Sequence, residues 1–195
     1  MKIIGLIASP RKAGNTAWIV DRILEGAKEQ GAETCSWHFG ELDIKPCRGC
    51  LSCHTGDRDR GCSIDDDMQR LYAALEQADA LVLGSPVYMG QMSAQAKIFT
   101  DRLFAQISPR FSPHFKEKAA AKKRLLLVFN QGNPDSGMFQ AYFEYTKKMF
   151  QLLEFEVDKV QVVAGMRNEP AHEREGLHTA MKDVGSSLVS GRFPE

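Results

Sequence analysis

The chain has 195 residues, of which 43% are hydrophobic and 26% are charged, so one domain with a sizeable hydrophobic core is expected. Its 25 basic and 25 acidic side chains cancel, which gives no electrostatic basis for nucleic-acid binding, and no apolar run approaches the roughly 20 residues of a membrane span. Charged residues at positions 2, 11 and 12 argue against a signal peptide, so we expect a cytoplasmic protein.

Apolar runs alternate with amphipathic stretches along the whole chain. Strands are predicted at residues 2–8, 33–39, 80–84, 124–130 and 157–164. Helices are predicted at residues 15–30, 66–78, 92–106, 136–153 and 171–190. The strand cores are continuously hydrophobic, as is typical of parallel strands that helices cover on both faces. Five strand–helix units therefore predict a doubly wound five-stranded parallel sheet in one three-layer α/β/α domain over residues 1–195.

The turn after the first strand, residues 9–16, combines hydroxyl, amide and cationic side chains directly before a helix. It is not a P-loop, because Lys12 precedes Gly14, and it lacks the three glycines of a dinucleotide-binding turn. The first turn of a helix offers free N–H groups and the positive end of the helix dipole. These features favour a site for a single phosphate, as in FMN. The alternative is an ordinary turn in which Asn15 and Thr16 cap the helix.

Two further turns are expected at the same edge of the sheet. If the strand order is 2-1-3-4-5, as in flavodoxin, the ligand crevice lies outside the carboxyl ends of strands 1 and 3. Residues 85–90 offer an apolar and aromatic wall with a glycine that permits close approach. Residues 130–134 are rich in amides and glycine. Together with residues 9–16, these turns predict one pocket for a flat ring that carries a phosphate.

The turns at 9–16 and 85–90, with the Lys-x-Phe-x-Asp-Arg segment at 97–102, resemble the NADPH-dependent FMN reductase group of flavodoxin-like proteins over residues 1 to about 165. The resemblance implies a flavodoxin-like fold, with the FMN phosphate in the first turn and the isoalloxazine against the second. We expect the 97–102 segment to anchor its helix outside the site. The expected FMN-binding residues, including the third turn, are Ser9, Arg11, Asn15, Thr16, Pro86, Val87, Tyr88, Met89, Gly90, Asn130, Gln131 and Gly132.

Two connections are unusually long, at residues 40–65 and 107–123. The first contains a cysteine-rich insertion at about 43–65, and cysteines in a reducing compartment favour metal or redox chemistry over structural disulfides. Three cysteines in one run favour an iron–sulfur cluster over zinc, whose ligands usually come in two separated pairs. The expected ligands are Cys47, Cys50, Cys53 and Cys62.

The cysteine segment resembles the iron–sulfur flavoprotein subgroup, which binds a [4Fe–4S] cluster beside the flavin. Its last gap, before Cys62, is longer than expected for that subgroup. Zinc, an oxidised redox pair and free thiols are the alternatives. Of the neighbouring residues, we expect Cys35 to be a buried small hydrophobe, His54 to be solvated, and the acidic run 65–67 to cap the next helix.

The expected function is that of an FMN-dependent oxidoreductase. It would pass electrons from NAD(P)H or a reduced ferredoxin-like carrier to an unknown acceptor, with the cluster as a relay, and hydride transfer to FMN requires no catalytic side chain. The alternative is a non-enzymatic electron carrier or redox sensor that uses the cysteine loop. A response-regulator-like module is disfavoured, because Ala8 and Ser9 stand where its acidic pair would be. We also expect a homodimer or homotetramer. Residues 107–123 and 138–143 are the candidate interface segments; the alternative is that the first is a solvated basic loop and the second packs in the core.

Overall fold

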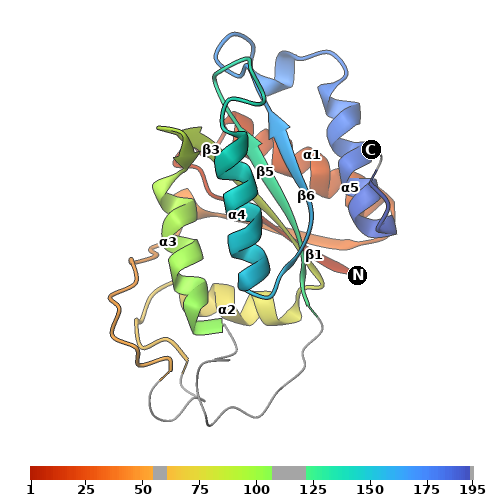
Figure 1. Cartoon of the computed structure of the whole chain (residues 1–195). Coiled ribbons are helices and arrows are strands. Elements are labelled where there is room, and N and C mark those ends of the chain that lie inside the picture. Colours follow the sequence, from red (N-terminus) through yellow and green to blue (C-terminus); the bar gives the residue numbers. More distant parts are fainter. Residues whose placement is uncertain (55–60, 107–121, 194–195) are drawn as a thin grey trace.

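The computed structural model describes residues 1–54, 61–106 and 122–193. Within these ranges the chain forms a six-stranded sheet with helices on both faces (Figure 1). The strands that run parallel lie in the order β2-β1-β3-β5-β6, and the short strand β4 pairs antiparallel with β3. The predicted flavodoxin-like order is therefore confirmed, with β4 as a sixth strand that the sequence did not reveal.

The elements largely follow the predicted alternation. The strands are β1 (Lys2–Ile7), β2 (Glu33–His38), β3 (Ala80–Tyr88), β4 (Gln91–Met92), β5 (Arg124–Asn130) and β6 (Glu156–Val163). The α-helices are α1 (Asn15–Glu29), α2 (Met68–Gln77), α3 (Ala94–Arg102), α4 (Gln140–Leu152) and α5 (Leu177–Ser190). Short 3-10 helices are η1 (Phe39–Glu41), η3 (Leu103–Gln106) and η4 (Ala171–Glu173).

Three predicted boundaries are wrong. The third strand continues to Tyr88, because pairing with β1 ends at Gly84 and Pro86 is tolerated where the strand has an open edge. The predicted helix 136–153 begins only at Gln140. The predicted helix 171–190 is divided into η4 and α5, since Gly176 adopts a left-handed conformation with φ of 74° between them.

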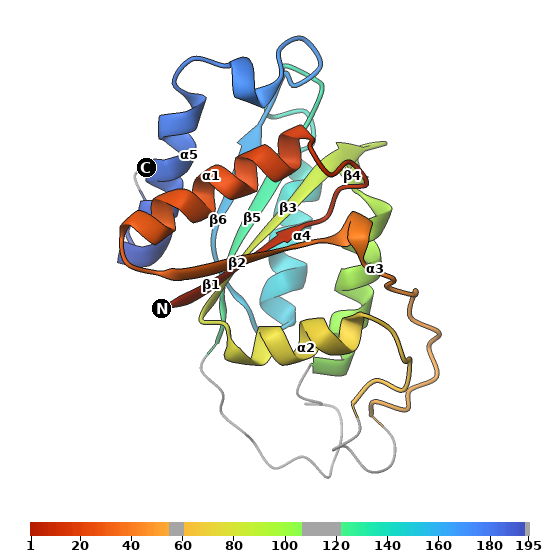
Figure 2. The ribbon, with the colours of Figure 1, turned by 180° about the vertical axis from the view of Figure 1, so that it is seen from behind.

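Two hydrophobic layers hold the helices to the sheet. Helices α1 and α5 cover one face, while α2, α3 and α4 cover the other (Figures 1 and 2). Fully buried Ile19 and Ile23 of α1 pack in the first layer, and Phe99 and Phe143 of α3 and α4 pack in the second. None of the described helices is long and apolar enough to cross a membrane.

The interface prediction is only partly open to inspection. Residues 107–121 lie outside the described part of the chain. In the second predicted segment, Met138 is 55% exposed, but Phe143 is buried and stacks on Phe129 with 4.6 Å between ring centroids. The interface prediction is therefore wrong for Phe143, because its place on α4 turns the ring toward the sheet.

Helices α1 and α5 cross with their backbones in direct contact, and glycine makes this approach possible. A Cβ atom on Gly26 would collide with the carbonyl oxygen of Lys182, and one on Gly185 would collide with that of Ile23. Any larger residue at either position must push the helices apart. The crossing therefore fixes α1, whose N-terminus follows the first turn of the predicted site.

We expect Gly185→Ala to lower the free energy of unfolding by about 1–3 kcal/mol, because overpacking outweighs the roughly 1 kcal/mol that alanine gains in helix propensity. The exposed Asp183→Ala on the same helix is the control and should not destabilise the protein. Urea unfolding followed by circular dichroism measures both. Equal stability of Gly185→Ala and the wild type would contradict the close crossing.

Candidate functional site

The last residues of β3 and the turns that follow β1, β5 and β6 surround one cavity of about 160 Å³ at the carboxyl edge of the sheet. Nine of the twelve predicted residues line it: Ser9, Arg11, Asn15, Thr16, Pro86, Val87, Tyr88, Asn130 and Gly132. Three lining residues were missed: Gly14, Met166 and Arg167. The cavity is smaller than the roughly 300–1,000 Å³ of pockets that enclose whole ligands, so a large ring here is only partly covered.

The first turn is held in place from within and from η1. The hydroxyl of Ser9, which is 3% exposed, accepts the N–H of Arg11 at 3.2 Å. The N–H of Gly40 donates to Nδ1 of His38 at 3.1 Å, so the neutral ring carries its proton on Nε2 and donates it to the carbonyl of Arg11 at 3.1 Å. Lys12 and Glu41 form an ion pair at 2.8 Å.

The alternative in which Asn15 and Thr16 cap α1 is wrong. Gly14 occupies the N-cap position, and no side chain bonds to the cap. Asn15 Oδ1 instead accepts the N–H of Ala171 at 3.0 Å, and Thr16 Oγ1 donates to Asn130 Oδ1 at 2.7 Å. The two side chains therefore join the first turn to η4 and to the turn after β5, and leave the N–H groups of the first helical turn available.

The electrostatics of this cavity favour an anion. Arg11 and Arg167 both line it, and within the described residues neither guanidinium takes part in a salt bridge. No carboxylate is among the lining residues. Two cations, the uncapped N-terminus of α1 and a wall formed by Pro86 and Val87 fit a phosphate joined to an apolar ring. The residues present thus fit FMN.

Met89 and Gly90 do not line the cavity, contrary to expectation. They form the two-residue tip of the β3–β4 hairpin, with φ of 50° and 79°, a turn that requires positive φ at both positions. Gly90 therefore serves the turn, and a Cβ there would touch the ring of Phe139. Met89 is 100% exposed and Tyr88 is 44% exposed, so the tip presents apolar surface beside the cavity.

Gln131 is also absent from the lining. Its side-chain amide donates to the carbonyls of Asn133 and Asp135, at 3.3 and 2.7 Å, and thus shapes its own turn. Arg167 and Met166 come from the turn after β6, which was not considered. The signal was present, because the carboxyl end of any parallel strand reaches the same edge and Arg167 is cationic.

The four predicted metal ligands lie between η1 and α2. All of these cysteines are free; Cys47 and Cys50 are exposed, whereas Cys53 and Cys62 are half-buried. Burial raises the pKa of Cys53, and the negative charges of the other three thiolates raise it further, so the four sulfurs lie within electrostatic range. Hydrogen bonds from Ser52 and Ser63 lower the pKa of the exposed Cys50 to about 7.

The donor set of four thiols suits an iron–sulfur cluster. Among the described residues, however, no three His, Cys, Asp or Glu side chains are arranged to hold a single metal ion. The cysteine loop therefore has the right ligands near one another, but they do not converge on one point.

Two predictions for neighbouring residues are wrong. Cys35 is exposed, because β2 is the edge strand of the sheet. His54 is not simply solvated: its Nε2 lies 2.8 Å from the carbonyl oxygen of Phe104, and the two rings have centroids 4.3 Å apart.

The acidic run caps α2 only in part. Asp66 accepts the N–H of Met68 at 3.1 Å, whereas Asp67, at the N-cap position, makes no side-chain cap bond. Asp67 instead accepts the N–H of Asp43 at 2.9 Å, across the cysteine loop. These carboxylates thus join the two ends of the loop.

The chain is similar to several known proteins. Residues 1–166 match the family model of the NADPH-dependent FMN reductases. The chain is 41% identical over 102 residues to an iron–sulfur flavoprotein of Methanosarcina thermophila, a match that covers 52% of each chain. An iron–sulfur flavoprotein of Methanocaldococcus jannaschii is 39% identical over 102 residues, which cover 52% of this chain and 51% of that protein. The chain thus matches about half the length of these curated relatives.

Solved structures share the fold. An NAD(P)H:quinone oxidoreductase from Methanothermobacter marburgensis superposes with a TM-score of 0.74 at 12% identity, covering 100% of this chain and 99% of that one. An FMN-dependent NADH-azoreductase from Bacillus anthracis, in complex with FMN, gives a TM-score of 0.61 at 13% identity, covering 96% and 99%. With the family match over residues 1–166, these findings show that the chain belongs to the NADPH-dependent FMN reductase family.

Proposed function

We propose that this protein binds FMN at the carboxyl edge of its sheet and catalyses electron transfer from NAD(P)H, or from a reduced ferredoxin-like carrier, to an acceptor. One observation carries the proposal: the uncapped N-terminus of α1, the apolar end of β3 and two cations border the same cavity. The cations are Arg11 and Arg167, and neither forms a salt bridge with another described residue. Membership of a family of FMN reductases supports it.

The residues that line the cavity would have different roles in binding FMN. Arg11, Arg167 and the N–H groups of α1 neutralise and bind the phosphate. The bond between Thr16 and Asn130 keeps the first and third turns at a constant separation. Bound FMN supplies the chemistry of hydride acceptance and single-electron exchange, so the chain needs no general acid or base. The exposed face beside Tyr88 leaves the cofactor accessible to an electron donor and an acceptor.

We further propose that Cys47, Cys50, Cys53 and Cys62 hold a [4Fe–4S] cluster. Three observations support this: the thiols are free, their charges interact, and the curated relatives named above are iron–sulfur flavoproteins. Zinc is less well supported, because its ligands usually come in two separated pairs, whereas three of these cysteines stand in one run. The cluster would supply one-electron transfer between FMN and a partner.

Arg11→Gln should weaken FMN binding by about tenfold to a hundredfold, the loss expected when a charge-assisted hydrogen bond to phosphate is removed. Riboflavin, which lacks the phosphate, should bind both proteins equally. Titration of the quenching of flavin fluorescence measures both ligands.

Lys28→Gln is the control for the loss of one positive charge, because Lys28 lies in the last turn of the same helix. It should leave FMN affinity unchanged. An equal loss of FMN and riboflavin affinity in Arg11→Gln would show that Arg11 does not contact the phosphate.

Protein purified without oxygen should contain FMN, iron and sulfide. Steady-state oxidation of NADH or NADPH with a quinone or ferricyanide as acceptor should be readily measurable. Reduction by a ferredoxin-like protein alone, without such turnover, would favour the non-enzymatic carrier. Protein without affinity for FMN would refute the proposal, whereas FMN without iron would remove only the cluster.

We propose a homodimer or homotetramer in which a second copy covers the apolar hairpin tip at Tyr88 and Met89. Met89→Asp should shift the sedimentation equilibrium toward monomer, because aspartate tolerates positive φ but adds a charge to the interface. Leu152→Asp is the control and should leave the equilibrium unchanged. Leu152 is 71% exposed and lies at the C-terminal end of α4, whereas the hairpin tip lies near its N-terminal end. A wild-type protein that sediments strictly as a monomer would contradict this assembly.

A further inference from the structure

The buried ion pair beneath the cysteine loop has a role that the FMN cavity does not explain. We propose that Arg102 is a positioning residue for the cysteine centre: paired with Asp66, it closes the base of the loop and places a fixed positive charge there. This inference rests on the proposed [4Fe–4S] cluster, and it concerns residues outside the FMN cavity.

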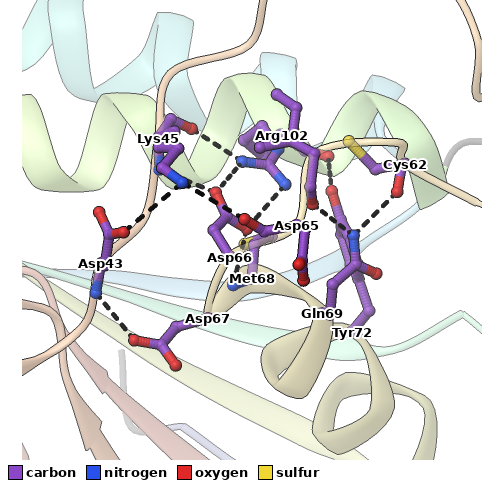
Figure 3. A network of polar contacts seen from close by, with 11 residues as sticks. Asp43, Lys45, Cys62, Asp65, Asp66, Asp67, Met68, Gln69, Tyr72 and Arg102 are labelled. Atoms are coloured by element: carbon purple, nitrogen blue, oxygen red, sulfur yellow. Dashed lines mark hydrogen bonds and ion pairs between the residues drawn. The ribbon is translucent and has the colours of Figure 1, made fainter.

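Arg102 and Asp66 are almost completely removed from solvent. Their side chains are 1% and 0% exposed. Nη1 donates to Asp66 Oδ2 at 2.6 Å, and Nη2 donates to Oδ1 at 3.1 Å, which is the bidentate geometry of a strong arginine–carboxylate pair (Figure 3). Burial raises the pKa of Asp66, but hydrogen bonds from Arg102 and from the N–H of Lys45 outweigh burial, so the pKa lies below its ordinary value and the pair is ionised at neutral pH.

Stability alone does not account for such a pair. The cost of desolvating two ions can equal or exceed their attraction, and apolar residues of similar volume often stabilise a protein as well or better. A buried ion pair is therefore better understood through what it orients. Here that is the backbone of the cysteine loop.

The pair joins the two ends of the loop. Arg102 Nη1 donates to the carbonyl of Lys45 at 2.8 Å, and the N–H of Lys45 donates to Asp66 Oδ2 at 2.9 Å (Figure 3). The bond from the N–H of Asp43 to Asp67 adds a second link. Residues 43–45 enter the loop and residues 66–67 leave it, so the Arg102–Asp66 pair fixes the distance that the cysteine segment must span.

The same network reaches Cys62. Gln69 Nε2 donates to the carbonyls of Cys62 and Ile64, at 2.8 and 2.7 Å, and Tyr72 Oη donates to the carbonyl of Arg102 at 2.7 Å (Figure 3). Cys62 is the ligand that follows the long gap, so these contacts bring the most distant cysteine to a defined place.

Arg102 also has one hydrogen-bond donor that the contacts above do not use. Its Nε–H is buried and has no hydrogen-bond partner among the described residues. An unsatisfied buried donor on a cation is costly, and a negatively charged thiolate-ligated centre nearby would offset that cost. A fixed cation would also favour the more negative, reduced state of a cluster and so raise its reduction potential.

The test compares Arg102→Gln and Arg102→Lys with the wild type, all reconstituted anaerobically with FMN, iron and sulfide. We expect Arg102→Gln to lose iron to a chelator about tenfold faster or more, the usual effect of removing a supporting partner of a metal site. Its remaining cluster should have a lower midpoint potential. Arg102→Lys should restore the potential, because the charge returns, but not the retention of iron, because lysine cannot bind Asp66 and Lys45 together.

Arg124→Gln is the matched control. It breaks a second ion pair, which is partly buried. Its Arg124 Nε and Asp158 Oδ2 lie 3.0 Å apart and join β5 to β6, away from the cysteine loop. It should retain iron and potential at wild-type values. Unchanged FMN affinity in every variant checks that the domain is folded, and if Arg102→Gln does not fold, the split between potential and retention in Arg102→Lys carries the test.

The outcomes separate this inference from the function it rests on. A wild-type protein that binds FMN but takes up no iron or sulfide refutes the cluster, and this inference with it. A wild-type cluster that is retained equally in Arg102→Gln, at the same potential, refutes the positioning role alone. Equal losses in Arg102→Gln and Arg124→Gln would reduce Arg102 to a general contributor to stability and would overturn the inference.

Discussion

Parallel pairing is the constraint on which this site depends. Because β1, β3, β5 and β6 run in the same direction, their carboxyl ends gather at one edge of the sheet and, with the turns after β1, β5 and β6, surround one cavity. Gly84 in β3 sharpens the arrangement, since a Cβ there would collide with Val20 and crowd Thr16 of α1. Without a side chain at Gly84, the N-terminus of α1 lies against the end of the strand. The hydrogen bond between Thr16 and Asn130 then spans the cavity floor.

The cysteine loop is built on a separate support. Its base is the Arg102–Asp66 pair, which lies among α2, α3 and the loop ends, on the opposite face of the sheet from α1. The short helix η1 connects the two regions: His38 and Glu41 contact the first turn of the cavity, and Asp43, two residues later, is bound to Asp67. The first turn of the cavity and the start of the cysteine loop are thus connected through residues 38–43, although different contacts hold the two regions in place.

Much of this architecture could be predicted from the sequence. Continuous apolar runs identify the buried parallel strands. The segments at the carboxyl ends of β1, β3 and β5 identify the cavity by their composition. Both signals are local. The errors concern partners distant in the chain. Asn15 and Thr16 have the composition of a helix cap but bond to Ala171 and Asn130. Gln131 binds its own turn, and the burial expected of Cys35 fails because β2 lies at the edge of the sheet. No local pattern encodes such pairings.

The contact between Gly26 and Lys182 links α1 to a helix that lies beyond the part of the chain matched by the family model. The family match ends at residue 166, whereas α5, at Leu177–Ser190, packs directly against α1 where the two helices cross. Because the backbones of α1 and α5 are in direct contact at Gly26 and Gly185, α1 cannot tilt toward α5. Helix α5 therefore supports the turn that precedes α1, and truncating the chain ahead of α5 would loosen this turn without removing a residue that lines the cavity.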